Sequence, residues 1–257
     1  MSEPNNTALA DLLVCACARA WEGDGEVLAS GIGIIQRLAA SLAMIENPEL
    51  MMTDSEAYIV SEPVPLGKRN GYEPRRETWM GFSRIFENVW SGRRHAMVGP
   101  SQIDKFGQAN ISALGDYQKP KVQMLGVRGF PGNSISHANS FFVPAHSKRV
   151  FVEGEVDTVC SIGYNNDRLP RGLSFDDIDI RLVVSDLCVM DFEPKSKQMR
   201  LLSTHPGVSV QDVLDNTGFD LAMADTVIET PLPTDAQLAV ISKLDPNNLR
   251  GSAVKAR

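Results

Sequence analysis

One stretch of this chain joins an apolar run to three glycines spaced by three: Lys121-Val122-Gln123-Met124-Leu125-Gly126-Val127-Arg128-Gly129-Phe130-Pro131-Gly132-Asn133. The apolar residues predict a short buried strand, and the pair Asn133-Ser134 predicts the cap of a helix. Glycine has no Cβ, so its backbone N–H groups can turn outward and approach a ligand closely. This succession suits an anion: a phosphate, a carboxylate or the oxyanion of an acyl-transfer step.

The spacing of these glycines matches neither common nucleotide motif. It is not Gly-x-Gly-x-x-Gly, and it lacks the Gly-Lys-Ser/Thr ending of a P-loop. An ordinary tight turn between a strand and a helix is the alternative interpretation.

The composition is that of an acidic globular protein. The 257 residues are 43% hydrophobic and 22% charged, with a net charge of −7. This charge argues against nucleic acid or an anionic membrane as the main partner. No uninterrupted apolar segment is long enough to span a membrane, and Asp11 interrupts the first apolar run, so we expect no secretory signal and a cytoplasmic protein. We expect a single domain over 1–257, with a disordered tail at 251–257.

The cysteines and histidines give no support for a metal site, and we predict none. The pair Cys15 and Cys17 is not a C-x-x-C motif, so buried reduced thiols are the better interpretation. The histidines show no H-x-x-x-H or H-E-x-x-H spacing. They are His95, His137, His146 and His205.

The first fifty residues alternate between helices and strands. A helix capped by Thr7 precedes a strand over 26–31, a second helix follows from Ile34 to Ile45, and a strand over 50–53 ends at Asp54. This order predicts an α/β fold with a mixed, mainly parallel sheet flanked by helices.

The rest of the chain is less regular. Residues 57–76 predict a long loop, and a third helix over 77–90 carries an aromatic stripe that we interpret as core or subunit interface rather than as a stacking platform. Short strands after Val150 predict an antiparallel or mixed C-terminal portion. Helices are expected over 210–216, closed by Gly218, and after Thr234.

Ligands of open parallel sheets bind at the carboxyl ends of strands. Three candidates stand there: Gly31-Ile32-Gly33, Asp54-Ser55-Glu56 and the glycine loop 126–133. A carboxylate pair at a strand end can act as nucleophile or general base, although solvated loop acids are the alternative. His137, near the glycine loop, is either an acid or base or a hydrogen-bonded structural residue. No Gly-x-Ser-x-Gly elbow is present, which counts against a serine hydrolase.

The same segments, in order, resemble the β subunit of class I CoA-transferases of the glutaconate branch. The resemblance rests on Asp24-Gly25-Glu26-Val27, Gln102 to Asn110, Gly115-Asp116-Tyr117, the glycine loop and Asp212 to Asp220. It implies an α/β fold with a mixed sheet and an active site shared with a separate α subunit, in an α2β2 assembly.

One position departs from the transferase pattern. The resemblance implies a glutamate that attacks the acyl-CoA and forms an acyl-enzyme, whereas Asp54 occupies the matching position here. Aspartate is one methylene shorter, and a misplacement of roughly an ångström costs about 10²-fold in rate. Glu56 would lie ~6–7 Å further along an extended chain and is a poor replacement.

A branch of the family without the transferase glutamate fits better. The chain resembles the β subunit of the two-subunit hydrolase that opens the last ring in bacterial steroid (cholesterol) degradation. That resemblance implies C–C cleavage of a cyclic β-keto acyl-CoA by water, with a glutamate of the α subunit as base. CoA enters as part of the substrate, and no other cofactor is expected. We assign backbone donors for substrate or CoA to Gly126, Gly129, Gly132 and Asn133, and a polar contact to Asp54.

Two alternatives stay open on the sequence. The chain is a CoA-transferase subunit with Asp54 as nucleophile, or a non-catalytic subunit that shapes the partner's site. Cations in Tyr72 to Arg76, or Arg128, would hold a free carboxylate of the substrate, although solvated loop charges are the default interpretation.

Overall fold

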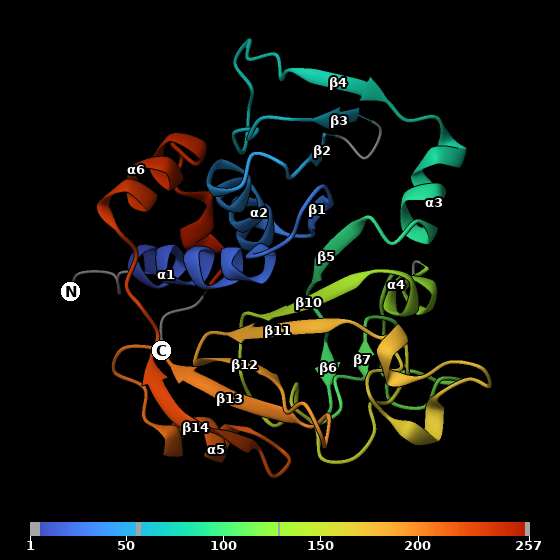
Figure 1. The fold of residues 1–257 in the computed structure, drawn as a ribbon. Helices are drawn as coiled ribbons and strands as arrows, with labels where there is room; N and C mark the ends of the chain where they lie inside the picture. Colours follow the sequence, from blue (N-terminus) through green and yellow to red (C-terminus); the bar gives the residue numbers. More distant parts are fainter. Residues whose placement is uncertain (1–5, 55–57, 128, 255–257) are drawn as a thin grey trace. The chain divides into compact units, whose positions relative to one another are not determined.

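The computed structural model describes residues 6–54, 58–127 and 129–254. It divides into two compact units, one formed by residues 1–98 with 231–257 and the other by residues 99–230 (Figure 1). The prediction of a single domain over 1–257 stays a prediction.

Two helices and two parallel strands form the centre of the first unit. Strands β1 (Leu28–Gly31) and β5 (Arg94–Val98) pair in parallel, and α2 (Ile34–Glu46) packs on β1. Helix α1 (Asn6–Ala18) packs on α2, and every residue from Ala10 to Ala18 is buried. Small residues dominate this segment, which lets the two helices approach closely.

The turn between β1 and α2 explains the first glycine pair. A Cβ on Gly31 would lie 2.1 Å from the backbone oxygen of Gln36, and a Cβ on Gly33, at φ 129°, would lie 2.3 Å from the Gln36 side chain. Only glycine fits at such distances. The packing of the start of α2 is therefore enough to explain the glycines of Gly31-Ile32-Gly33, which were predicted as a candidate ligand site.

A small antiparallel sheet corrects the predictions for residues 50–90. Met51 makes a parallel bridge to Leu28, but the chain then forms β2 (Met52–Asp54), which pairs antiparallel with β3 (Tyr58–Val60). The predicted loop thus contains a strand, and β4 (Arg76–Trp79) pairs with β3. Helix α3 (Phe82–Trp90) is shorter than predicted because Thr78 and Trp79 favour the strand and Gly81 precedes the helix.

The aromatic stripe of this region does not enter the core. Helix α3 has no buried residue, and Trp79, Phe82, Phe86 and Trp90 are between 49% and 77% exposed. The prediction that this stripe lies in the core was therefore wrong. The alternative, a subunit interface, stays a prediction.

Five strands form the sheet of the second unit: β10 (Ala138–Val143), β11 (Ile180–Ser185), β12 (Cys188–Phe192), β13 (Met199–Thr204) and β14 (Ala222–Glu229). β10 with β11 and β13 with β14 are parallel, whereas β12 is antiparallel to both of its neighbours. The predicted α/β class, with a mixed, mainly parallel sheet and an antiparallel C-terminal portion, is confirmed. β14 was not predicted, because its exposed and half-buried residues show no clean alternation.

Short hairpins and capped helices complete the two units. β6 (Gln102–Ile103) pairs with β7 (Ala109–Asn110), and β8 (Ala113–Leu114) pairs with β9 (Val122–Gln123). Capping boxes at Ser209 and Thr234 begin α5 (Val210–Asn216) and α6 (Asp235–Leu244). Both helices and the Thr234 cap were predicted.

Gly218 does not close α5, which ends at Asn216 with Thr217 as its C-cap. A Cβ on Gly218 would lie 2.4 Å from the backbone oxygen of Phe151, so glycine is required there for close approach.

The four cysteines are free and buried, which confirms the expected thiols. Burial raises the pKa of Cys15 to about 12, so this thiol is unreactive. Among the described residues, no helix is long and apolar enough to cross a bilayer.

The C-terminal segment is ordered further than predicted. Residues 249–252 form a 3₁₀ helix and Val254 is buried, which corrects the predicted tail, while 255–257 lie outside the described residues. Arg250 anchors this segment: its Nε lies 2.6 Å from Asp11 Oδ1, and its Nη1 lies 3.1 Å from Asp245 Oδ2. All three side chains are buried.

Replacement of this guanidinium should destabilise the protein strongly. Arg250→Met leaves two buried carboxylates without their cation, and we expect the free energy of unfolding to fall by about 3–5 kcal/mol in urea titrations. Arg19→Met is the control, since Arg19 pairs with Glu22 at 3.5 Å on the surface and should cost less than about 1 kcal/mol. Equal losses in the two variants would contradict this account.

Candidate functional site

Asp54 ends β2 and is only 2% exposed. Both of its carboxylate oxygens accept hydrogen bonds from Arg69: Nη1 lies 3.1 Å from Oδ2, and Nη2 contacts Oδ1. A second guanidinium approaches the same group, with Arg76 Nη2 at 3.9 Å from Oδ2. Two arginines therefore face one buried carboxylate.

The hairpin positions these cations. Tyr58 lies opposite Asp54 in the β2–β3 register, and the guanidinium of Arg76 stacks 4.5 Å above the Tyr58 ring. Arg69 arrives from the loop between β3 and β4. The hydrogen bond to Asp54 raises the pKa of Arg69, which keeps this guanidinium charged.

The loop between β3 and β4 has its own internal anchor. Glu62 accepts hydrogen bonds from the Tyr72 hydroxyl, at 2.8 Å, and from the Arg75 backbone N–H, at 2.6 Å. The Arg75 backbone bond, together with Tyr72, lowers the pKa of Glu62. Arg75 itself pairs with Glu77 at 3.0 Å. Of the predicted segment Tyr72 to Arg76, only Arg76 has its charged group directed at Asp54.

This geometry gives Asp54 the character of an anchor. A carboxylate clamped by a guanidinium has one lone pair of each oxygen engaged and its charge compensated, which lowers its nucleophilicity. Ser55 and Glu56, the rest of the predicted acidic site, lie outside the described residues.

The glycine loop differs from its prediction in two respects. The predicted buried strand is the two-residue β9, and both of its residues are exposed, as are Leu125 and Val127. Helix α4 (Phe130–Ser136) begins after Gly129, so Gly132 and Asn133 lie inside the helix and Asn133-Ser134 is not its cap. The run is apolar without being core, because β8 is its only described strand partner.

Gly126 and Gly129 nevertheless have positive φ, 83° and 73°, and a Cβ at either would meet no atom within 4 Å. Packing therefore does not explain these two glycines, and the space beside their backbone is open. Arg128 lies outside the described residues.

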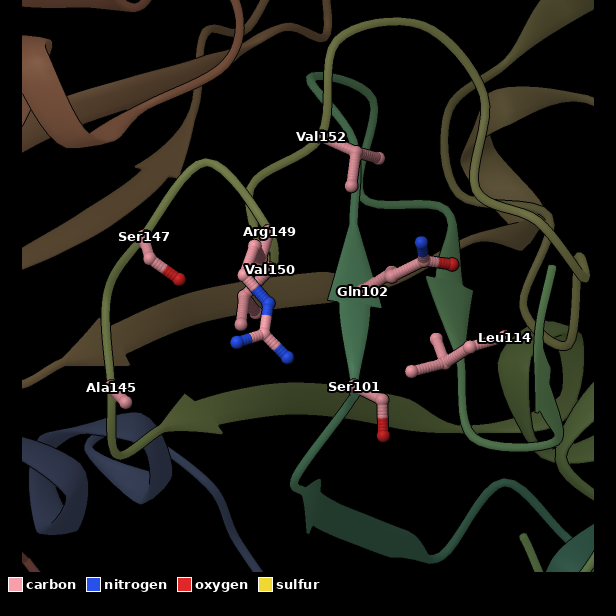
Figure 2. A pocket seen from close by; sticks show the side chains of 8 residues that line it. All are labelled: Ser101, Gln102, Leu114, Ala145, Ser147, Arg149, Val150 and Val152. Carbon is pink, nitrogen blue, oxygen red and sulfur yellow. The ribbon is translucent and has the colours of Figure 1, made fainter. Parts of the chain in front are cut away.

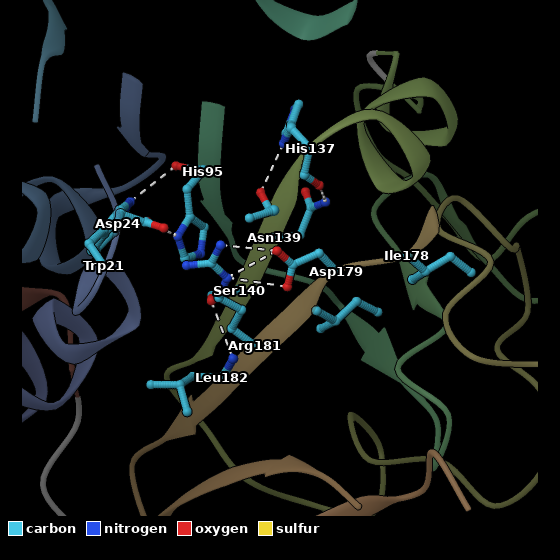
Figure 3. A network of polar contacts seen from close by, with 12 residues as sticks. Trp21, Asp24, His95, His137, Asn139, Ser140, Ile178, Asp179, Arg181 and Leu182 are labelled. Atoms are coloured by element: carbon cyan, nitrogen blue, oxygen red, sulfur yellow. Dashed lines mark hydrogen bonds and ion pairs between the residues drawn. The ribbon is translucent and has the colours of Figure 1, made fainter. Parts of the chain in front are cut away.

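Helix α4 is held to β10 by its ends. Phe130 packs edge-to-face on Phe141, with ring centroids 6.2 Å apart. The Asn139 side chain donates to the backbone oxygen of Asn133 at 3.1 Å. It also donates to the backbone oxygen of His137 at 2.7 Å (Figure 3). His137 is buried with its Nδ1 2.8 Å from the Ala138 backbone oxygen. This placement matches the structural interpretation of His137.

A second polar cluster lies within the first unit. The buried His95 ring has its Nδ1 2.8 Å from Asp24 Oδ2, and Trp21 Nε1 donates to the His95 backbone oxygen at 3.2 Å (Figure 3). These contacts hold the turn after α1 against β5. The family segment Asp24 to Val27 thus includes a structural acid.

The segment Gln102 to Asn110 is also structural. Asn110 donates to the Gln102 side chain at 2.8 Å, and Gln102 donates to Asp157 at 3.0 Å. Asp104 Oδ1 accepts the backbone N–H groups of Phe106 and Gln108, each at 2.9 Å, which closes the turn between β6 and β7.

A cavity of about 470 Å³ opens beside this segment, between Ser101 and Gln102 on one wall and Arg149 and Val150 on another (Figure 2). None of the predicted site residues Asp54, Gly126, Gly129, Gly132 and Asn133 lines it. It is a separate feature of the second unit.

Comparison with known proteins decides the family. Residues 23–216 match the family model of coenzyme A transferases. The cholesterol ring-cleaving hydrolase IpdB subunit of Mycobacterium tuberculosis is 41% identical over 249 residues, which cover 96% of this chain and 98% of that protein. This chain belongs to the coenzyme A transferase family.

Solved structures of this family agree in fold. The crystal structure of Rhodococcus jostii RHA1 IpdAB matches with a TM-score of 0.88 and 39% identity, over 96% of this chain and 98% of that chain. Glutaconate coenzyme A-transferase from Acidaminococcus fermentans matches with a TM-score of 0.76 and 26% identity, over 97% and 98%. The resemblance drawn from the ordered motifs is confirmed.

Within this coenzyme A transferase chain, the predicted site residues fall in different units. Asp54 belongs to the first unit, and the glycine loop belongs to the second. Arg69 was missed, because its contact with Asp54 depends on how a hairpin folds back over 15 residues. The available signal was the cluster of basic residues after an acidic strand end: Lys68, Arg69, Arg75 and Arg76.

Asp104 should make stability depend on pH. Burial raises its pKa to about 7, against the two backbone hydrogen bonds that lower it. Between its ordinary pKa and about 7, the folded state keeps a proton that the unfolded state releases, so stability falls as pH rises through this window.

Asp104→Asn keeps an oxygen for both N–H groups and carries no charge. We compare the free energies of unfolding of this variant and of wild type in urea titrations. The difference, variant minus wild type, should increase by about 2–3 kcal/mol between pH 5 and pH 8. The matched control is Asp116→Asn, an exposed turn residue that accepts the Gln118 N–H at 2.8 Å. A difference from wild type that stays constant with pH would refute the assignment.

Proposed function

We propose that this chain is the β-type subunit of a two-subunit hydrolase that opens a ring of a steroid-derived acyl-CoA. The near full-length relatives named as cholesterol ring-cleaving hydrolase subunits support this reading. The partner is a separate α-type subunit, as the paired name of the IpdAB structure suggests. An α2β2 assembly is part of the proposal.

The pairing of Asp54 with Arg69 is the observation that favours a hydrolase over a transferase. An acyl-enzyme mechanism requires a carboxylate that is free to attack the thioester carbon. Here both oxygens of Asp54 are held by one guanidinium, and a second lies 3.9 Å away. With no free carboxylate at this position, water is the attacking group.

The proposed reaction is hydrolytic cleavage of a cyclic β-keto acyl-CoA. Water adds to the ring ketone, and the C–C bond breaks with its electron pair delocalised into the thioester as an enolate, which is then protonated. The base is supplied by the α-type subunit. Backbone N–H groups around Gly126 and Gly129, whose surroundings are open, donate to the developing oxyanion. Gly132 and Asn133 position this loop as part of α4.

CoA enters as part of the substrate, and the proposal requires no further cofactor. Acyl-CoA thioesters are intracellular metabolites, and the chain carries four free thiols, so we propose a cytoplasmic location.

Turnover without an acceptor acid tests the function. The chain is co-expressed with its α-type subunit, and the purified complex is assayed on a cyclic β-keto acyl-CoA by mass spectrometry of the products. We expect the ring-opened acyl-CoA, carrying one added water, to form at the same rate with and without a carboxylic acid acceptor.

Hydroxylamine provides the discriminating control. A transferase that forms an acyl-enzyme at Asp54 would be inactivated by hydroxylamine after exposure to acyl-CoA, whereas the proposed hydrolase should keep its activity. Loss of activity with a hydroxamate at Asp54, or strict dependence on the acceptor, would establish the transferase instead.

The exposed aromatic residues support a place for the partner subunit. Phe82, Phe86 and Trp90 are four residues apart and share a face of α3, and Trp79 precedes them on β4. Their exposed area is on the order of 500 Å², a large part of the ~800 Å² that each partner buries in a stable interface. We propose that this aromatic face binds the α-type subunit.

Polar substitution of the aromatic face should prevent assembly. For Phe82→Glu with Phe86→Glu we expect affinity for the α-type subunit to fall by about 100-fold or more, measured by light scattering after size exclusion. The thermal unfolding of the isolated chain should not change. Arg84→Glu, on the opposite side of α3, is the control. An intact complex would contradict the proposal. So would a dimer of the isolated wild-type chain that the substitutions abolish, since the face would then bind a second copy of this chain.

A further inference from the structure

The cluster around Asp54 carries more positive charge than Asp54 neutralises. Two guanidinium groups, those of Arg69 and Arg76, face its buried carboxylate, and the only second acid paired with them among the described residues is Glu73, which is 82% exposed and 4.0 Å from Arg76. We infer that Arg69 and Arg76 form a binding site for a free carboxylate on the acyl portion of the substrate, with Asp54 as the positioning residue. This inference rests on the proposed function and specifies its substrate class.

Arg69 is fixed but not saturated. Its two Nη atoms each direct one hydrogen at Asp54, and a guanidinium has five N–H donors. The side chain is 36% exposed, although its partner carboxylate is almost fully buried. Asp54 therefore holds one edge of the guanidinium from inside and leaves donors accessible from solvent.

Arg76 is held without using its donors. Its guanidinium stacks on the Tyr58 ring, and its nearest carboxylate oxygens, on Asp54 and Glu73, lie at 3.9 Å and 4.0 Å, beyond hydrogen-bond distance. Within the described residues, no group accepts a hydrogen bond from this side chain, which is 40% exposed. Stacking fixes the plane of the group, so less entropy is lost when a ligand binds.

The chemistry of the site favours a carboxylate over a phosphate. A planar guanidinium fork matches both carboxylate and phosphate in geometry, so charge is the deciding property. Asp54 compensates one of the two cations, which leaves one guanidinium for a singly charged group. The phosphates of CoA are the other oxyanions of the substrate, and their larger charge would remain mostly uncompensated here. A ring-opening substrate with an acid side chain would thus be held by that side chain.

A pair of substrates tests the inference in the reconstituted complex. One is a cyclic β-keto acyl-CoA with a carboxylate side chain, and the other carries a methyl ester in its place. For Arg76→Gln we expect kcat/KM to fall about 10–100-fold with the acid, through KM, and to change less than twofold with the ester. Arg69→Lys keeps the charge beside Asp54 but loses the fork, and we expect the same selective loss.

Lys68→Gln is the matched control, because it removes one positive charge from the same loop without a contact to Asp54. It should leave both substrates unaffected. Equal losses on acid and ester in Arg76→Gln would overturn the inference, since a purely structural cation cannot distinguish the two. A loss in Lys68→Gln as large as that in Arg76→Gln would also overturn it, by showing a diffuse charge effect.

A binding measurement keeps this test separate from the proposed function. By calorimetry, the wild-type complex should bind glutarate, a small dicarboxylate, and Arg76→Gln should bind it about tenfold more weakly, with free CoA bound equally by both. A loss of CoA binding in the variant would assign the site to phosphate and overturn the inference. If the wild-type complex opened the ring of neither the acid nor the ester substrate, the proposed function would fail. The glutarate comparison alone would then decide the inference.

Discussion

Removing a carboxylate from water is costly unless a cation and hydrogen bonds replace the lost hydration. Asp54 is almost fully buried, and this constraint determines how the chain between β3 and β4 must fold. The loop has to return far enough for Arg69 to reach both carboxylate oxygens. The hydrogen bonds from Tyr72 and Arg75 to Glu62 tie the base of the loop together and so make this return possible. One buried charge therefore organises the loop of residues 61–75.

In the glycine loop, backbone conformation rather than packing requires glycine. Gly31, Gly33 and Gly218 are required because backbone or side-chain atoms leave no space for a Cβ. Gly126 and Gly129 have the same conformational freedom but open surroundings, and only the backbone conformation at positive φ requires glycine there. A conformation that exposes N–H groups without a packing reason is the kind that a ligand can stabilise. The two proposed contributions of this chain are thus different in kind: side-chain cations in the first unit, and backbone donors in the second.

The sequence predicts elements whose information is local. The helices at 6–18, 34–46, 210–216 and 235–244 follow from apolar spacing and caps such as Thr234, and the structure agrees within a residue or two. Predictions fail where tertiary contacts override the pattern. The apolar residues Val122 and Leu125 are exposed, and the segment from Arg76 forms a strand before the chain forms a helix. Asp54 was recognised as the unusual residue, yet its partner Arg69 was not, because the pairing depends on a hairpin register that composition does not encode.

A carboxylate at this position can serve one of two purposes, and they compete with each other. An attack on a thioester is favoured by an uncompensated charge, whereas a carboxylate that orients a guanidinium has one lone pair of each oxygen engaged and its charge compensated. The short side chain of Asp54 favours the second purpose, because it keeps the charge at the strand end, where Arg69 reaches it from the loop. Lengthening the side chain by one methylene would not by itself restore a nucleophile, since the same guanidinium would still engage it. In the proposed hydrolase, the hairpin therefore matters as much as the acid: Asp54 holds the guanidinium that we infer to bind the substrate.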